Sequence, residues 1–175
     1  MKISVPELQE GDNFLQFRET PSSLELTGLS VEFATDIPVS LRLQRRKDEI
    51  LVWASASATV TEECSRCLKA VERKFDVEFE AFCDKIGARS EKGEAGQEGG
   101  ETFVAFHDGT TLELGPCVRE AIVLSLPMKP LCSDDCKGLC PVCGANLNEN
   151  SCTCDRGRVD PRWSALEKLR KKEEK

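Results

Sequence analysis

Six of the ten cysteines in this chain lie within the 23 residues from Cys132 to Cys154. The residues between them are polar and rich in turn formers, so hydrophobic burial cannot offset the conformational entropy lost when the segment becomes ordered. Some other interaction must hold it. The opening residues, Met1–Glu7, lack the apolar stretch of a secretory signal, so we expect a reducing cytoplasmic setting. In that setting clustered cysteines are more often metal ligands than disulfides.

Zinc fits such a segment because four thiolates at about 2.3 Å from one ion lie about 3.8 Å apart and cross-link the chain. In small zinc fingers this binding contributes on the order of 10–16 kcal/mol. The strongest pair is Cys140 and Cys143, because a Cys-x-x-Cys-Gly turn is tight and Gly144 tolerates a positive φ. We therefore expect structural zinc, as one or two ions. The candidate ligands are Cys132, Cys136, Cys140, Cys143, Cys152 and Cys154.

The sequence leaves the arrangement of these ligands open. Six thiolates exceed the four that one zinc ion normally takes, so either two are spare or the site is binuclear with bridging sulfurs. Cys152 and Cys154 would lie about 6.5 Å apart on an extended strand, which is too far for one tetrahedron unless the backbone bends. The choice among these arrangements depends on the tertiary structure.

A second pair, Cys64 and Cys67, lies where two predicted strands meet. Three interpretations remain: a redox-active dithiol, half of a metal site completed by other cysteines, or a hairpin turn that happens to contain cysteine. Cys83 and Cys117 are isolated, and we expect them to be ordinary buried thiols.

Alternation of apolar and polar residues predicts β-strands over residues 24–33, 37–44, 50–60 and 71–81. A bulge at Gly28 would absorb the change of phase in the first of them, and Arg46–Glu49 is short and polar enough for a hairpin. Residues 102–106 predict a fifth strand. The expected fold class is α+β: an antiparallel β-sheet of about five strands with a packing helix, a cysteine-rich zinc-binding loop and a C-terminal helix.

The packing helix is predicted to begin at Gly115-Pro116, with Val118 and Ile122 on its apolar side, and to end before Pro127. A second helix is predicted over residues 160–172. Residues 85–101 hold five glycines and four glutamates and predict a flexible acidic loop. We expect a β-rich domain over residues 1–130 and a segment over 131–175 that combines the cysteines with a basic C-terminal helix.

The net charge of −7 excludes a uniformly basic nucleic-acid-binding protein, but the charge is uneven: residues 156–175 carry +4 and the rest −11. No apolar run approaches the roughly 18 residues that span a bilayer, so we expect no membrane contact. RNA contact, if any, would use the C-terminal tail. The candidate RNA-contact residues are Arg156, Arg158, Arg162, Lys168, Arg170, Lys171 and Lys172.

The sequence offers no recognisable catalytic group. It has no phosphate-binding glycine loop and no Ser/His/Asp arrangement, and its one histidine, His107, precedes a predicted Asp108-Gly109 turn. Zinc sites made of thiolates alone, with no open position, are usually structural. We therefore expect no enzyme activity, no catalytic residues and no small-molecule substrate.

The order of these motifs resembles the YceD-like family of bacterial and plastid proteins, named for large ribosomal RNA subunit accumulation. The resemblance covers nearly the whole chain and is most specific in its C-terminal part. It rests on Cys64-Ser65-Arg66-Cys67-Leu68, Val118-Arg119-Glu120-Ala121-Ile122, Leu126-Pro127, Cys132, Cys136-Lys137-Gly138-Leu139-Cys140, Pro141-Val142-Cys143-Gly144, Asn146-Leu147-Asn148, Cys152-Thr153-Cys154 and Asp160-Pro161-Arg162-Trp163.

The resemblance implies a non-enzymatic role in the synthesis or accumulation of 23S ribosomal RNA and in assembly of the large ribosomal subunit. Some members of the family lack the C-terminal cysteines, which implies that the cluster is a structural support. An acidic body suits a basic partner, such as a ribosomal protein, because opposite potentials steer encounter. The alternative is a thiol-redox or zinc-sensing protein that uses Cys64 and Cys67.

Overall fold

The computed structural model describes residues 1–29, 31–86 and 101–155, and the chain divides into two compact units. Unit 1 comprises residues 1–63 and 70–130; unit 2 comprises residues 64–69 and 131–175. Most of the predicted acidic loop and the whole predicted C-terminal helix lie outside the described residues. The same is true of every candidate RNA-contact residue: Arg156, Arg158, Arg162, Lys168, Arg170, Lys171 and Lys172.

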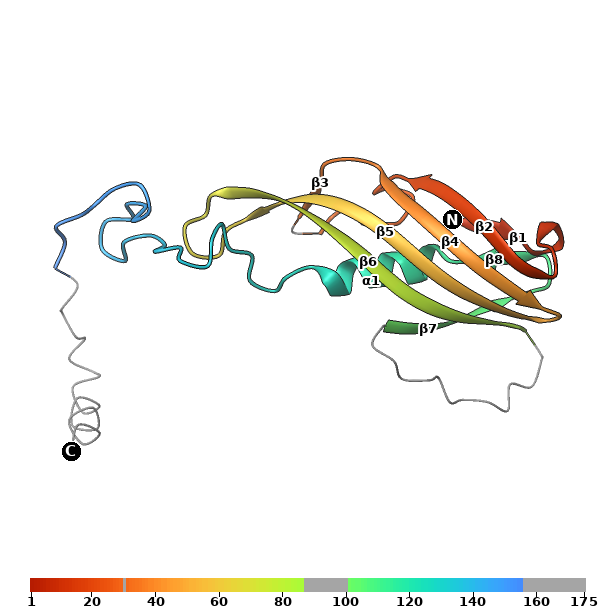
Figure 1. Ribbon diagram of the computed structural model, residues 1–175. Helices are drawn as coiled ribbons and strands as arrows, with labels where there is room; N and C mark the ends of the chain where they lie inside the picture. The colour runs from red at the N-terminus through yellow and green to blue at the C-terminus, as the bar shows by residue number, and fades with distance from the viewer. Residues whose placement is uncertain (30, 87–100, 156–175) are drawn as a thin grey trace, which may run out of the picture. The chain divides into compact units, whose positions relative to one another are not determined.

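Unit 1 is one eight-stranded sheet with a single α-helix in its described part (Figure 1). The strand order is β1-β8-β7-β6-β5-β4-β2, and the short β3 pairs with β5 off this path. The strands are β1 (Lys2–Ser4), β2 (Gly11–Glu19), β3 (Glu32–Phe33), β4 (Ile37–Arg46), β5 (Glu49–Glu63), β6 (Ala70–Lys85), β7 (Glu101–His107) and β8 (Thr111–Glu113). The helix is α1 (Gly115–Ser125), and a 3-10 turn, η1, covers Val5–Glu7.

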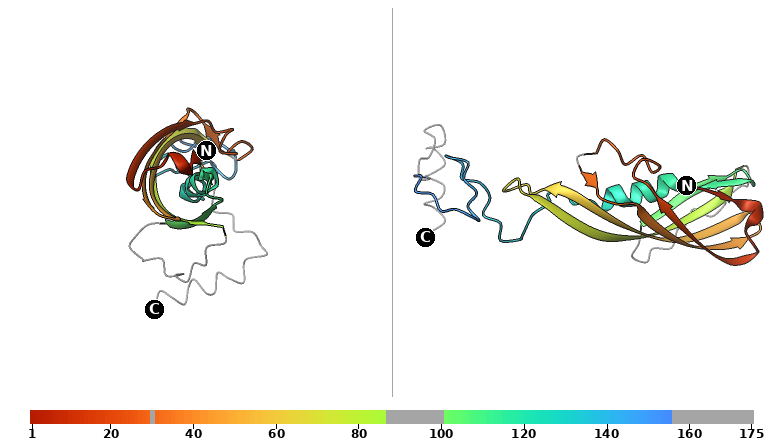
Figure 2. Two further views of the ribbon diagram at one scale, coloured as in Figure 1. Left: turned by 90° about the vertical axis from the view of Figure 1, so that its right-hand side faces the viewer. Right: turned by 90° about the horizontal axis from the view of Figure 1, so that it is seen from above.

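The sheet curls around α1, as the end-on view in Figure 2 shows. Alternate residues of β4, β5 and β6 are buried on the side that faces the helix, so each strand has one apolar and one exposed side. From α1, Val118, Ala121 and Ile122 enter the same core. The curled sheet therefore has an inner face, covered by the helix, and an outer face that carries the more exposed side chains between the buried ones.

The expected fold class is wrong. The described residues are mostly β, in a mixed sheet of eight strands, whereas the prediction was an α+β fold with an antiparallel sheet of about five. β7 runs parallel to β6, with Glu101–His107 beside Phe79–Lys85, so the sheet is mixed. Alternation along a strand does not reveal the direction of its neighbour, so the pattern could not distinguish the two cases.

The prediction of one strand over residues 24–33 is also wrong. Leu24 and Leu26 are buried, but Leu24 lies in a turn and Leu26 between that turn and the next, and only Glu32–Phe33 pairs with β5. β2 was missed because its outward position Phe14 is aromatic while its inward position Asn13 is polar, which inverts the usual alternation. Burial of an apolar residue does not by itself require a strand.

Other local predictions are confirmed. Strands cover residues 37–44, 50–60, 71–81 and 102–106, and β4 and β5 form a hairpin in which Arg46 pairs with Glu49. The helix α1 begins at Gly115 and ends at Ser125, next to the extended Leu126 that precedes proline. No helix in the described part of the chain is long and apolar enough to cross a membrane.

Candidate metal centres

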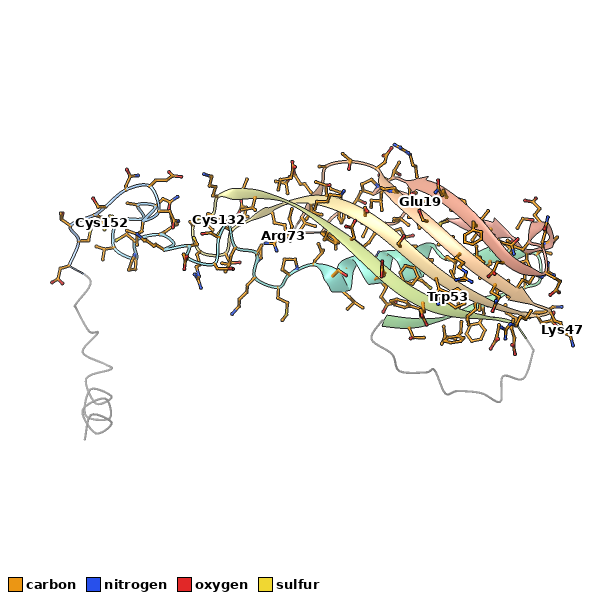
Figure 3. All side chains as sticks on the ribbon, viewed as in Figure 1. Glu19, Lys47, Trp53, Arg73, Cys132 and Cys152 are labelled. Atoms are coloured by element: carbon orange, nitrogen blue, oxygen red, sulfur yellow. The ribbon has the colours of Figure 1, made fainter. Side chains whose placement is uncertain are left out.

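Eight cysteines of unit 2 gather into two groups of four, and within each group the sulfur atoms lie within 4.8 Å of one another. Figure 3 labels one member of each group, Cys132 and Cys152. The first cysteine group is Cys64, Cys67, Cys132 and Cys136; the second cysteine group is Cys140, Cys143, Cys152 and Cys154.

The spacing of these sulfurs fits a tetrahedral thiolate site. In the first group the Sγ atoms of Cys64 and Cys136 are 3.8 Å apart, and those of Cys67 and Cys132 are 3.6 Å apart. A zinc ion with four bonds of about 2.3 Å requires sulfurs about 3.8 Å apart, whereas a disulfide requires about 2.05 Å. All ten cysteines are free thiols. The donor set and its spacing therefore suit one metal ion in each group.

The six residues from Cys64 to Lys69, which connect β5 to β6, fold into a tight turn. The Cys64 amide donates to the Lys69 carbonyl at 2.9 Å, and the Leu68 amide donates to the Cys64 carbonyl at 2.9 Å. Leu68 has a φ of +59°, in the left-handed region that residues other than glycine rarely occupy. This backbone turns the side chains of Cys64 and Cys67 toward the same point.

The Cys140–Ala145 segment repeats this turn in the second group. The Cys140 amide donates to the Ala145 carbonyl at 2.8 Å, and the Gly144 amide donates to the Cys140 carbonyl at 2.9 Å. Gly144, with a φ of +74°, occupies the position that Leu68 takes in the first turn. The Cys64–Lys69 turn thus has the same backbone geometry as the Cys140–Ala145 turn, although leucine stands where the second turn has glycine.

Arg66 joins the two segments of the first group. Its Nη1 atom donates to the carbonyls of Asp134 at 3.1 Å and Cys136 at 3.0 Å, and its own carbonyl accepts from the Leu139 amide at 3.1 Å. At Gly138, with a φ of +73°, an added Cβ would lie 3.0 Å from the Arg66 carbonyl oxygen. A glycine is therefore required where the two segments make contact.

The backbone between the two groups is ordered by an antiparallel bridge between Leu139 and Asn146 and by the Leu147 amide, which donates to the Gly138 carbonyl at 2.9 Å. The Asn148 side chain lies beside the first group, where its Nδ2 atom donates to the Cys136 sulfur at 3.3 Å. A hydrogen bond of this kind stabilises a thiolate and fixes its orientation. These contacts make the Asn146-Leu147-Asn148 motif a structural support for the first group.

The first group has uneven thiol acidity. Burial raises the pKa of Cys64, but hydrogen bonds from the backbone of Cys67, Arg66 and Cys132 together outweigh burial and lower the pKa to about 6. The pKa of Cys132 is raised to about 12, chiefly by its interactions with the sulfurs of Cys136 and Cys67. The group therefore contains a ready thiolate but cannot ionise all four thiols unless a cation is bound.

The second group shows the same division. Hydrogen bonds from the backbone of Cys143 and Val142 lower the pKa of Cys140 to about 6. The pKa of Cys154 is raised to about 12, chiefly by its interaction with the Cys143 sulfur. A divalent cation would remove this repulsion in either group, and borderline-soft Zn²⁺ is the usual choice for four thiolates.

The structure brings all six candidate ligands of the C-terminal segment together, but in two groups and with Cys64 and Cys67 added. The interpretation of that pair as half of a metal site agrees with this geometry. Cys83 and Cys117 lie apart in the core of unit 1, where burial raises the pKa of Cys83 to about 12. The sequence did not predict that Cys64 and Cys67 meet Cys132 and Cys136.

The only histidine is already satisfied within unit 1. His107 is buried at the end of β7, where its Nδ1 atom accepts from the Gly109 amide at 3.1 Å. The other ring nitrogen, Nε2, therefore carries the hydrogen and donates to the Asp48 carbonyl at 2.9 Å. Neither nitrogen of this ring is free to bind a metal ion or to transfer a proton.

A family model described as large ribosomal RNA subunit accumulation protein YceD matches residues 52–170. The chain belongs to the YceD family. The matched region includes both cysteine groups, α1 and the strands from β6 to β8.

Among curated relatives, a protein of Bacillus subtilis called YlbN is 30% identical, with 99% of each chain covered. An uncharacterised protein of Mycobacterium tuberculosis is 29% identical over 84% of this chain and 68% of its own length. The large ribosomal RNA subunit accumulation protein YCED homolog 1, chloroplastic, of Arabidopsis thaliana is 22% identical over 78% of this chain. The match covers 49% of that plant protein. No solved structure matches the chain significantly.

Proposed function

We propose that this chain is a non-catalytic factor for accumulation of the large-subunit ribosomal RNA, and that it acts in assembly of the large ribosomal subunit through contacts with a basic protein. Membership of the YceD family is the observation that carries this proposal, together with the name of the plant relatives, large ribosomal RNA subunit accumulation protein. The two cysteine groups support a binding role, because a zinc ion held by four thiolates would have no open position for a substrate.

Each cysteine group would hold one zinc ion as a structural support. The ion would neutralise the four thiolates and fix the polar residues 131–155, which few buried apolar side chains hold. Zinc with four protein ligands has no open position, so its contribution is to stability and shape. This arrangement presents a fixed surface for a partner without adding chemistry of its own.

Charge favours a protein partner. Residues 1–155 carry −11, which repels the phosphates of RNA and attracts a basic ribosomal protein. Direct contact with ribosomal RNA would need the +4 C-terminal residues, among them Arg156, Arg158 and Arg162. We therefore place protein contact first and RNA contact second.

Deletion of the gene in its own cell tests the proposal. We expect 23S ribosomal RNA to fall relative to 16S ribosomal RNA, and large subunits to be depleted on a sucrose gradient, with both restored by the wild-type gene. Pull-down at low and moderate salt should recover a basic large-subunit component whose binding weakens as salt rises. Unchanged 23S ribosomal RNA in the deletion strain would refute the role.

The second candidate function is thiol-redox or zinc sensing by Cys64 and Cys67, and the lowered pKa of Cys64, about 6, is the observation in its favour. The geometry favours metal binding, because two further sulfurs lie within 4.8 Å of this pair and a reactive Cys-x-x-Cys usually begins a helix. A Cys64→Ser variant distinguishes the two. Loss of disulfide exchange activity with metal content unchanged would support the redox role.

A further inference from the structure

The outer face of the sheet carries an aromatic and apolar surface that no described element covers. Phe14 is 73% exposed, Val104 64% and Phe106 61%. Phe82 of β6 lies between Leu51 of β5 and Val104 of β7 in the register, so these side chains form a continuous row across three strands. Exposed apolar surface of this extent commonly marks an interaction site.

Beside this row the outer face is hollowed. A shallow open hollow of about 560 Å³ lies over β2, β4, β5 and β6. Two small side chains, Ser40 and Ser55, are cross-strand neighbours and form its floor. The larger side chains of Phe14, Trp53 and Glu78 stand around them, and Figure 3 labels Trp53 on the sheet. The hollow results from this contrast in size.

The wall of the hollow is held in place by contacts among its own residues. The Trp53 Nε1 atom donates to the Glu80 carboxylate at 3.0 Å, and the Arg42 guanidinium lies 5.2 Å from the centre of the Trp53 ring. Arg42 is also paired with Asp12 at 3.3 Å, so its charge is already balanced. The Glu78 carboxylate has neither a hydrogen bond nor an ion pair among the described residues.

The strand β6 adds an acidic row that continues from the hollow. Its outward positions carry five carboxylates against one lysine, and successive outward residues repeat about every 6.8 Å. An extended peptide has the same repeat. The acidic row comprises Glu72, Asp76, Glu78, Glu80 and Asp84, with Lys74 the one cation among them.

We propose that the outer face binds an extended, positively charged segment of a partner protein, with one arginine or lysine side chain entering the hollow between Phe14, Trp53 and Glu78. An aromatic wall and a carboxylate together favour a cationic side chain with an apolar stem. The same carboxylates repel the phosphates of RNA. This inference rests on the proposed function, because it locates the surface that a basic ribosomal protein would meet.

Trp53 provides the measurement. With Trp163, the only other tryptophan, replaced by phenylalanine, the emission of the full-length protein reports on the hollow alone. The probe is a peptide of about ten residues that alternates arginine and alanine and matches the repeat of β6. We expect a saturable change in Trp53 emission that weakens as salt rises, and none with a glutamate-alanine peptide or with oligouridine RNA of the same length.

Two matched pairs of variants separate the hollow from general acidity. Filling it by Ser55→Leu should lower the affinity roughly fivefold or more, whereas Thr59→Leu, outward on the same strand, should leave it unchanged. The double change Glu78→Gln with Glu80→Gln should weaken binding by a similar factor, whereas the matched double change Glu113→Gln with Glu120→Gln, at exposed carboxylates outside the acidic row, should have little effect. Circular dichroism and metal content establish that each variant is folded.

Equal affinity in Ser55→Leu and the wild type, or a Trp53 response to RNA in place of the basic peptide, would overturn the inference. The deletion experiment is read independently. If deletion lowers 23S ribosomal RNA but the hollow variants bind the peptide as the wild type does, the proposed function stands and this surface is excluded. If deletion leaves 23S ribosomal RNA unchanged, the proposed function fails whatever the peptide does.

Discussion

The two cysteine groups have the same donor atoms but differ in how the chain reaches them. In the first group, Cys64 and Cys136 are 72 residues apart in the sequence, whereas all four ligands of the second lie within residues 140–154. Closing a longer loop costs more conformational entropy, so a metal ion that holds it closed contributes more to stability. The metal ion of the first group therefore joins distant parts of the chain, whereas that of the second stabilises a local segment.

The two groups also differ in burial, and the first is the more buried. In the first group only Cys132 is exposed, whereas in the second only Cys140 is buried. Exposed thiolates are more accessible to chelators and oxidants. The first group should therefore retain its metal ion longer than the second.

The largest expected effect comes from Cys136→Ser. It should reduce the metal content from two ions per chain to one, with loss of metal-binding free energy on the order of 10 kcal/mol, because one ligand of the long-range group is removed. Metal analysis and hydrogen exchange over residues 131–139 measure this. Cys117→Ala is the control, because Cys117 belongs to neither group, and it should leave both ions bound. Two retained ions in Cys136→Ser would contradict the assignment.

Removal of metal by a chelator should proceed in two steps, and the first ion lost should be that of the second group. Cys154→Ser identifies the step: it should abolish the fast phase and leave the slow phase at its wild-type rate. Release measured with a chromophoric chelator gives both rates. A single phase, or a fast phase that persists in Cys154→Ser, would show that burial does not determine which group releases its metal ion first.

Two glycine substitutions compare the groups at the level of the backbone. Gly138→Ala should weaken metal binding by the first group by about 2 kcal/mol, because a positive φ is strained for alanine and the new Cβ meets the Arg66 carbonyl at 3.0 Å. In Gly144→Ala the positive φ is also strained, but the new Cβ has no atom within 4 Å, so metal binding by the second group should weaken by only about 1 kcal/mol. Chelator competition measures both. Equal losses would show that the contact at Gly138 is unimportant.

The smallest effect is expected at Leu68, which holds the left-handed position of the first turn with a φ of +59°. Leu68→Gly relieves the strain, although glycine has more conformational entropy to lose on folding, so metal binding by the first group should improve by no more than about 0.5 kcal/mol. Binding by the second group should not change. A marked loss of affinity would indicate that the Leu68 side chain has a packing role in the turn.

Within the candidate site, the sequence predicted those features that residues close together in the chain determine. The spacing of Cys140 and Cys143 before Gly144 indicated a tight turn that exposes two sulfurs to one metal, and the structure has that turn. The partition of the ligands could not be deduced. It depends on Cys64 and Cys67 meeting Cys132 and Cys136, and no local pattern specifies a contact between segments so far apart.

The fold shows the same limit. Alternation of apolar residues located β4, β5 and β6, and proline and glycine located α1, because these signals act within a few residues. The parallel pairing of β7 with β6 and the edge position of β2 depend on which strands meet across the sheet. Sequence alone thus determined four of the eight strands, β4 to β7, together with α1 and the cysteine turn. Only the tertiary structure decided which strands pair and which sulfurs meet. Both depend on contacts between residues that are far apart in the sequence, and no local pattern specifies such contacts.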